Sequence, residues 1–364
     1  MSRLIVTYRV RSDAVSIEAR ARDIATEQSV EMPLAPIDDA FVKSEIIGTV
    51  EGIADSGGGA FDVRVGLSAQ TIGGDAGQLL NMLFGNTSLH DDVSLHDVEI
   101  PAELAGLFGG PNGGVDALRR RVNAQSRALT CSALKPQGLP PEDLAAISGK
   151  LAEGCIDYIK DDHGLADQAY SPFAKRVRAC AKAAQNATRA SGHATRYAPS
   201  LSGNLDAMRL QVDVARDAGI DTLLIAPMIA GWANFQSLVR ENRDIAFMSH
   251  PALGGAQIAP PLLAKLFRLL GADAIVFPNF GGRFGYSPDT CRALAQAALG
   301  DWHGVKPALP VPAGGMTLER VPELLDFYGK DVMLLIGGSL LSAKDRLADE
   351  TAKFTEAVKR YSYR

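Results

Sequence analysis

The sequence predicts an α/β protein in which a C-terminal (β/α)₈ barrel follows a smaller N-terminal α+β domain. In the C-terminal part, eight short apolar runs alternate with helical patterns, as in a barrel. The length of 364 residues also suits one barrel of about 250 residues with a smaller domain beside it. A doubly wound sheet would show the same alternation, but the count of eight and the length favour the barrel.

The elements of the barrel can be assigned from these runs. The eight predicted strands are residues 128–134, 155–159, 195–197, 222–225, 245–248, 274–277, 308–311 and 332–336. The clearest helical patterns between them are 141–153, 172–190, 205–218 and 318–328.

The N-terminal part has a different order of predicted strands and helices. We expect strands at 4–10, 45–53 and 60–66, a helix at 16–28, a turn at 55–59 and an apolar segment at 79–84. Gly and Pro crowd into residues 108–114, which is the strongest boundary signal in the chain. The predicted domains are therefore 1–113 and 114–364.

Composition and charge argue against some classes of partner and indicate the cellular compartment. The net charge is −5 and no long basic run occurs, which argues against a nucleic-acid partner. No run approaches the ~18 apolar residues of a membrane span, and the N-terminus lacks the pattern of a signal peptide. The four cysteines (Cys131, Cys155, Cys180 and Cys291) are far apart without a CxxC pair, which is typical of the reducing cytoplasm. We expect an untargeted cytoplasmic protein.

Charged residues follow the second predicted strand, at the end of a barrel where catalysis takes place. Lys160, Asp162 and His163 stand there together. If CO₂ carbamylates Lys160, the new carboxylate can join Asp162 and a third ligand on a hard cation. Without that modification the lysine could act as a base or a Schiff-base nucleophile. The ordinary alternative is a solvated charged loop, which the position at a strand end disfavours.

Three more polar residues follow other predicted strands. Lys135 could polarise a carbonyl or move a proton, although a surface lysine would look the same. His250 ends the fifth run, where functional and structural roles are equally consistent with the sequence. Arg283 lies in a glycine-rich loop that could close over a carboxylate or phosphate, or it is simply an exposed loop arginine.

Paired glycines end the last two strands, at Gly314-Gly315 and Gly337-Gly338. Loops in these places of a barrel often bind phosphate, because bare backbone N–H groups can face an anion. The alternative is two tight turns without a ligand. Two pairs in corresponding positions favour a phosphate site.

The order of these residues resembles the large-chain family of RuBisCO along nearly the whole sequence. Residues 154–163, GCIDYIKDDH, resemble the family signature G-x-D-F-x-K-D-D-E, and 134–139, LKPQGL, resemble K-P-K-x-G-L. The resemblance implies that Lys160 is the carbamylated lysine, Asp162 a Mg²⁺ ligand and Lys135 the proton-transfer residue. His163 stands where the family has glutamate, so a nitrogen would replace an oxygen ligand.

Further matches concern the phosphate and a second subunit. The glycine pairs match the family's phosphate-binding segments, and Ser249-His250-Pro251 resembles its histidine–arginine pair. Glu27 and Asn86, with Asn81 as an alternative to Asn86, match segments that reach a neighbouring barrel. The resemblance therefore implies a homodimer or a higher even oligomer.

The departures from the family pattern are informative about function. Gln137, Pro251 and Arg283 replace the second lysine, a phosphate-binding arginine and the lysine of the mobile loop. Donors for a second phosphate and for CO₂ are thus lost, while the metal centre, Lys135 and one phosphate site remain. The resemblance implies a RuBisCO-like enzyme that does not carboxylate ribulose bisphosphate.

The predicted reaction is Mg²⁺-dependent enolisation, as isomerisation, tautomerisation or decarboxylation, of a phosphorylated sugar or oxo-sugar acid. The histidine at 163 and the loop arginine slightly favour a substrate with a carboxylate. Two alternatives remain open: a metal-free aldolase with a Schiff base on Lys160 or Lys135, and a non-catalytic protein that binds sugar phosphates.

Overall fold

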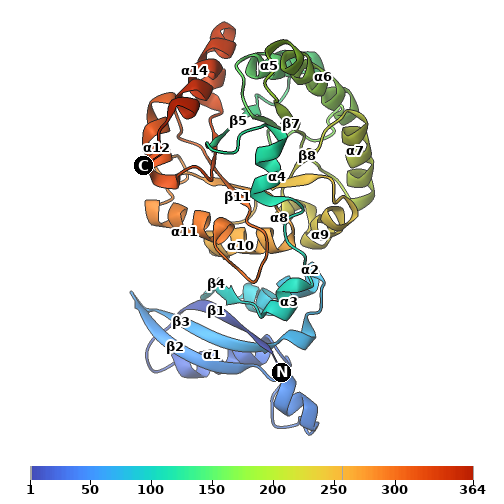
Figure 1. Ribbon diagram of the computed structural model, residues 1–364. Helices are drawn as coiled ribbons and strands as arrows, with labels where there is room; N and C mark the ends of the chain where they lie inside the picture. Colours follow the sequence, from blue (N-terminus) through green and yellow to red (C-terminus); the bar gives the residue numbers. More distant parts are fainter. Residues whose placement is uncertain (1, 256, 364) are drawn as a thin grey trace.

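The computed structural model describes residues 2–255 and 257–363, and it contains two sheets (Figure 1). One is a four-stranded antiparallel sheet in the N-terminal part, and the other is an eight-stranded parallel sheet surrounded by helices. The predicted fold class is confirmed. No helix in the described residues is both long and apolar enough to cross a membrane.

The small sheet has the order β2-β3-β1-β4. Its strands are β1 (Arg3–Arg11), β2 (Thr49–Gly57), β3 (Ala60–Ser68) and β4 (Val93–Glu99). Every second residue of β1 is fully buried, and helix α1 (Ile17–Glu27) packs against β2 and β3. This alternation is what a sheet with one covered face requires.

Two expectations for this part were wrong in detail, and one strand was missed. The predicted strand 45–53 begins only at Thr49, because Val42–Ile46 forms a short π-helical turn. The predicted turn 55–59 overlaps the end of β2, which continues to Gly57. The apolar segment 79–84 lies in helix α2 (Ala76–Phe84), and β4 had not been predicted.

The eight parallel strands close into a barrel with the order β7-β6-β5-β12-β11-β10-β9-β8. They are β5 (Leu129–Leu134), β6 (Tyr158–Asp161), β7 (Arg196–Ala198), β8 (Thr222–Ile225), β9 (Ala246–Ser249), β10 (Ala274–Pro278), β11 (Leu309–Ala313) and β12 (Met333–Leu335). A bridge between Ser200, just beyond β7, and Leu224 of β8 joins the first and last strands of this order. All eight strands overlap the predicted runs.

Helices form a ring around this barrel (Figure 1). The ring contains α5 (Pro141–Glu153), α6 (Phe173–Ser191), α7 (Leu205–Asp217), α9 (Trp232–Glu241), α10 (Pro260–Leu270), α11 (Pro288–Leu299), α12 (Val321–Tyr328) and α14 (Leu347–Arg360). Two four-residue helices, α8 (Pro227–Ala230) and α13 (Gly338–Leu341), directly follow β8 and β12. Before them come α3 (Ala102–Gly106) and α4 (Gly114–Arg121), and short 3₁₀ turns occupy Ala69–Thr71, Asn86–Leu89, Leu318–Arg320 and Lys344–Arg346.

The two parts of the chain are joined by backbone and side-chain contacts. The N–H of Leu95 in β4 donates to the carbonyl of Gln257, and the N–H of Ala259 donates to the carbonyl of Leu95. The side chain of Gln236 in α9 accepts from the N–H of Ala76, at 3.1 Å. The small sheet ends at Glu99 and the barrel begins at Leu129, so the division after residue 113 stays a prediction.

The barrel interior is filled by alternate residues of the strands. These inward residues form one apolar cluster that includes Leu129, Cys131, Tyr158, Leu224, Ala246, Met248, Ala274, Val276, Leu309, Val311, Met333 and Leu335. Because side chains alternate with a period of two, the same register carries on past the strand ends. It directs positions 135, 160, 162, 250 and 337 towards the mouth of the barrel.

Candidate active site at the mouth of the barrel

Lys160 is the most deeply buried charged residue expected at the site. It lies on β6, its residue surface is 3% exposed, and its Nζ donates to the carbonyl oxygen of Asp161 at 2.8 Å. Burial lowers the pKa of Lys160 below the ordinary range of lysine. A larger share of neutral amine follows, and the neutral amine is the form that can attack CO₂.

Asp162 is the centre of a group of polar contacts. The Nζ of Lys135 lies 2.7 Å from its Oδ1, the Nδ1 of His163 lies 3.6 Å from the same atom, and the Nε2 of Gln137 lies 3.4 Å from Oδ2. Burial acts to raise the pKa of Asp162, but the neighbouring His163 and Lys135 bring it well below its usual range. Asp162 is therefore an anion at neutral pH.

His250 completes the group from the opposite part of the barrel wall. Its ring stacks on that of His163, with centroids 4.0 Å apart and planes 12° apart. The N–H of Ala252 donates to its Nδ1 at 3.1 Å, which leaves Nε2 to carry the ring proton. Burial lowers the pKa of His250 to about 2, with further contributions from the charges of Lys160 and His163. His250 is thus a neutral donor.

Asp161, the middle residue of the Lys-Asp-Asp run, points the other way and has a structural environment. Its carboxylate accepts from the hydroxyl of Tyr197 at 2.6 Å, from the Nε of Arg176 at 3.2 Å and from the N–H of Ser200 at 3.1 Å. Arg176 also donates to backbone carbonyls of the loop that follows β6. Sequence reasoning had missed this network, because its partners come from α6, β7 and the segment after β7.

The donor set at the mouth fits a divalent cation only if Lys160 is modified. In the described parts of the chain, no three His, Cys, Asp or Glu side chains gather closely enough to hold a metal. A carbamate on Lys160 would add an anionic oxygen ligand beside Asp162 and His163. The buried, partly neutral amine of Lys160 is chemically suited to that modification.

The two glycine pairs lie at the rim but in different surroundings. A Cβ at Gly315, whose φ is +65°, would lie 2.5 Å from the Cα of Gly282, so packing between two loops alone requires glycine there. A Cβ at Gly337 or Gly338 would meet no atom within 4 Å. The backbone at Gly337-Gly338 is therefore open to a ligand. Gly314, at φ +84°, also has free space around it.

Arg283 and the two N-terminal residues are not brought into this cluster within the chain. Arg283 is exposed, and its guanidinium lies 4.9 Å from the ring centroid of Phe284. Glu27 and Asn86 contact each other, because the Nδ2 of Asn86 donates to the Oε1 of Glu27 at 2.8 Å. Glu27 ends α1, which lies outside the ring of barrel helices (Figure 1). Which of Asn86 and Asn81 reaches a neighbouring barrel stays a prediction.

Comparison with known proteins identifies the family of this chain. Residues 114–347 match the family of the ribulose bisphosphate carboxylase large chain, catalytic domain. The chain therefore belongs to the RuBisCO large-chain family, as its strand-end residues predicted. Within this family it is an enzyme of the RuBisCO-like class.

Particular relatives are similar over almost the full length. The chain is 60% identical over 359 residues to a 5-methylthioribulose-1-phosphate isomerase of Rhodospirillum rubrum, covering 98% of this chain and 96% of the relative. It is 54% identical to ribulose bisphosphate carboxylase-like protein 1 of Rhodopseudomonas palustris, covering 98% and 97%. A crystal structure of a RuBisCO-like protein from Rhodopseudomonas palustris superposes with a TM-score of 0.94 at 51% identity, covering 100% and 99%.

Proposed function

We propose that this enzyme isomerises 5-methylthioribulose 1-phosphate, or a closely related ketose 1-phosphate, by moving a proton between neighbouring carbons. The observation that carries the proposal is the contact of Lys135 with Asp162 beside the buried amine of Lys160. A proton carrier and a candidate cation site thus share one small space. The 60% identity to an isomerase of this substrate supports the choice.

The candidate ligands of a Mg²⁺ ion are a carbamate on Lys160, the carboxylate of Asp162 and the ring of His163. A bound Mg²⁺ would supply Lewis acidity that makes the hydrogen next to the substrate carbonyl more acidic. The residues fit this ion in charge and in ligand type, because two anionic oxygens and one imidazole would meet at the barrel mouth.

The protein's own groups then account for binding and proton transfer. The open backbone at Gly337-Gly338, with Gly314-Gly315 beside it, receives the phosphate. Lys135 takes the proton from the carbon next to the carbonyl and delivers it to the former carbonyl carbon, while the proton of the adjacent hydroxyl passes to the former carbonyl oxygen. A carbamate on Lys160 would be the alternative proton carrier. The Nε2–H of His250 donates to a substrate oxygen, and Arg283 closes over the substrate when its loop moves.

Carboxylation of ribulose bisphosphate does not fit this set of residues. Gln137, Pro251 and Arg283 stand where the family has two lysines and an arginine. A preference for a carboxylate-bearing substrate finds no support in the names of the relatives. We further propose a cytoplasmic homodimer or higher even oligomer, in which Glu27 and Asn86 complete the site of the neighbouring subunit.

Proton NMR in D₂O tests the proposal directly. With 5-methylthioribulose 1-phosphate, Mg²⁺ and bicarbonate, we expect conversion of the substrate and incorporation of deuterium next to the carbonyl. Lys160→Met and Lys135→Met should abolish both signals, and Lys353→Met, a change on the exposed surface of α14, should not. Absence of substrate conversion with the unaltered enzyme would contradict the proposal.

The same experiment separates the two alternatives. A Schiff-base aldolase would retain activity in EDTA and would be trapped on Lys160 or Lys135 by borohydride in the presence of substrate. A non-catalytic binding protein would perturb the substrate resonances without exchanging any proton.

A further inference from the structure

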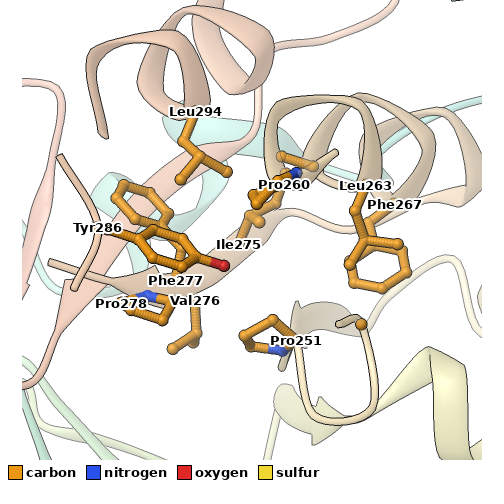
Figure 2. Close-up of a pocket in the computed structure, with 12 residues that line it drawn as sticks. Pro251, Pro260, Leu263, Phe267, Ile275, Val276, Phe277, Pro278, Tyr286 and Leu294 are labelled. Atoms are coloured by element: carbon orange, nitrogen blue, oxygen red, sulfur yellow. The ribbon is translucent and has the colours of Figure 1, made fainter. Parts of the chain in front are cut away.

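The loop after β10, residues 279–286, carries Arg283 and is anchored at its far end. There Tyr286 lines a small apolar pocket behind the barrel wall, together with Pro278 of β10 and Leu294 of α11 (Figure 2). The side chain of Tyr286 packs against the main apolar core, and burial raises the pKa of its hydroxyl. The loop therefore ends at a fixed point.

The near end of this loop is held by one arginine from another segment. Arg320 ends the 3₁₀ turn Leu318–Arg320, and its Nη1 donates to the carbonyl of Gly315 at 2.9 Å and to that of Phe280 at 3.3 Å. The guanidinium also lies 5.2 Å from the ring centroid of Phe280. One side chain thus bonds both to the loop after β10 and to the loop after β11.

The direction of this guanidinium is fixed by Glu323. The Nε and the Nη2 of Arg320 both donate to the carboxylate of Glu323, each at 2.9 Å. These bonds raise the pKa of Arg320 above its usual value, so the side chain is always charged. Because the guanidinium is a planar, rigid fork, a carboxylate that occupies two of its nitrogens also sets the direction of the third. Nη1 is thereby held towards the two loop carbonyls.

The two loops that Arg320 joins touch through their backbones. A Cβ at Gly315 would lie 2.5 Å from the Cα of Gly282, and a Cβ at Gly282 would lie 3.0 Å from the carbonyl oxygen of Gly314. A Cβ at Gly281 would lie 3.1 Å from the Nη1 of Arg320. The arginine therefore closes one edge of a tight contact between the loops, and a shift of the whole loop after β10 would break its bond to Phe280.

The tip of the loop lies between the two fixed ends and is open to solvent. Phe284 is 57% exposed, and Arg283 beside it is exposed as well. Gly281 and Gly285 flank them with φ of +71° and +69°, a left-handed conformation that glycine adopts without strain. Glycine also passes readily to other backbone conformations, so residues 282–284 can move while the ends stay in place.

We infer that Arg320 is a positioning residue for Arg283. It fixes the base of the loop after β10 against the loop after β11, so that the tip closes from a constant position and brings Arg283 to the substrate. The action on substrate rests on the proposed function, whereas the restraint on the two loops does not. A hydrogen bond from a charged donor corresponds to a factor of about 10 or more in an equilibrium constant, which sets the size of the expected effects.

The first test measures the restraint without any substrate. Arg320→Met removes the donors and keeps an apolar chain over Phe280. Millisecond hydrogen–deuterium exchange, read by mass spectrometry, follows the amides of residues 279–286 and 314–318. We expect both loops to exchange at least about 10-fold faster in the variant, because local opening no longer breaks a bond to the guanidinium. Unchanged exchange in either loop overturns the inference.

Arg292 offers a matched control. Like Arg320 it pairs with a carboxylate three positions away, that of Asp289 at 2.8 Å, and its guanidinium lies 5.0 Å from an aromatic centroid, that of Phe327. Among the described residues, however, it donates to neither loop. Arg292→Met should therefore leave the exchange of both loops unchanged, and faster exchange in this variant too would show that loss of any such surface pair loosens the loops and would overturn the role of Arg320.

The second test is kinetic and uses 5-methylthioribulose 1-phosphate. Arg320→Met should raise KM about 10-fold and change kcat less than about 2-fold. Arg320→Lys, which keeps the charge and one donor group, should lie between Arg320→Met and the unaltered enzyme. In an Arg283→Ala background, Arg320→Met should change KM by less than about 2-fold, because the side chain that it positions is gone. An equal rise in both backgrounds overturns the positioning of Arg283.

The outcomes separate this inference from the proposed function. If the unaltered enzyme converts no ketose 1-phosphate, the proposed function fails, and hydrogen exchange still decides whether Arg320 restrains the two loops. If the substrate is converted and Arg320→Met loosens the loops without any change in KM, the positioning of Arg283 is overturned and the isomerase proposal is unaffected.

Discussion

The buried ion pair between Asp161 and Arg176 anchors the segment that carries Lys160 and Asp162. Removing one partner measures how much this pair contributes to the free energy of unfolding. Both side chains are fully buried, and the Nε of Arg176 lies 3.2 Å from the Oδ2 of Asp161. The perturbation is Asp161→Ala, which removes the carboxylate and leaves the guanidinium of Arg176 in place. Because Asp161 points away from the mouth, this change removes no candidate ligand.

The expected loss of stability follows from the contacts that remain. Arg176 keeps its bonds to the carbonyls of Ala166 and Ser171, but it loses its only described anionic partner. Breaking a buried pair in this way costs about 3–5 kcal/mol. Tyr197 and Ser200 also lose their acceptor, and each unpaired donor costs about 1–3 kcal/mol, although these effects overlap and do not simply add.

Urea unfolding followed by circular dichroism measures the change. We expect the free energy of unfolding to fall by at least about 3 kcal/mol in Asp161→Ala. Glu99→Ala, which removes an exposed partner of Arg64, should cost less than about 1 kcal/mol.

A second comparison isolates the charge. Asp161→Asn alone leaves a buried guanidinium facing a neutral amide, whereas Asp161→Asn with Arg176→Met removes both charges and keeps an acceptor for Tyr197. The double variant should be more stable than Asp161→Asn alone. A loss below about 1 kcal/mol in Asp161→Ala, or a double variant less stable than the single one, would refute the reasoning.

Three further predictions concern catalysis. Lys160→Met should lower turnover at least about 100-fold and abolish stimulation by Mg²⁺ and bicarbonate in initial-rate assays; retained stimulation would contradict a carbamate at this position. Arg283→Ala should raise KM more than it lowers kcat, because the exposed side chain contacts substrate only on loop closure. An effect on kcat alone would contradict this role of Arg283 in substrate binding. Glu27→Gln should be nearly inactive while remaining oligomeric. Mixed oligomers of Glu27→Gln with Lys160→Met should regain activity, because each hybrid contains one intact site; no recovery would place Glu27 in its own subunit's site.

Much of the candidate site was predictable, because it depends on the simplest property of a strand. Lys160 and Asp162 are two positions apart, so they share the inner face that Tyr158 already defines. The same period places Asp161 on the outer face. The sequence alone thus explains why only one of the two adjacent aspartates faces the mouth.

The partner of Asp161 was not predictable from the sequence. Arg176 lies in a helix with Lys175 and Arg178 as neighbours, and such a run ordinarily indicates a solvated face. Its burial depends on where α6 packs against the barrel, which is a property of the whole fold. The stacking of His163 on His250 likewise joins residues that are 87 positions apart in the sequence.

Strand β4 was not predicted from the sequence, because its alternation of buried and exposed residues is interrupted. Val93, Leu95 and Val98 are buried, so the alternation breaks between Leu95 and Val98. The pairing with β1 shifts register at the same place, since Thr7 pairs with Asp97 and Tyr8 with Leu95. A bulge adds one residue to the strand and reverses the inward and outward faces. A search for strict period two therefore fails on this segment.

The glycine pairs show why a sequence motif and a ligand site are not the same thing. From the sequence, Gly314-Gly315 and Gly337-Gly338 are equivalent. In the structure, Gly315 is required by contact with Gly282, so a tight approach of two loops explains it without any ligand. Nothing nearby would obstruct a side chain at Gly337 or Gly338, and neither has the positive φ that demands glycine. Packing does not account for this second pair. Access of an anion to the backbone would account for it, and we therefore expect the phosphate at the loop after β12 rather than at the loop after β11.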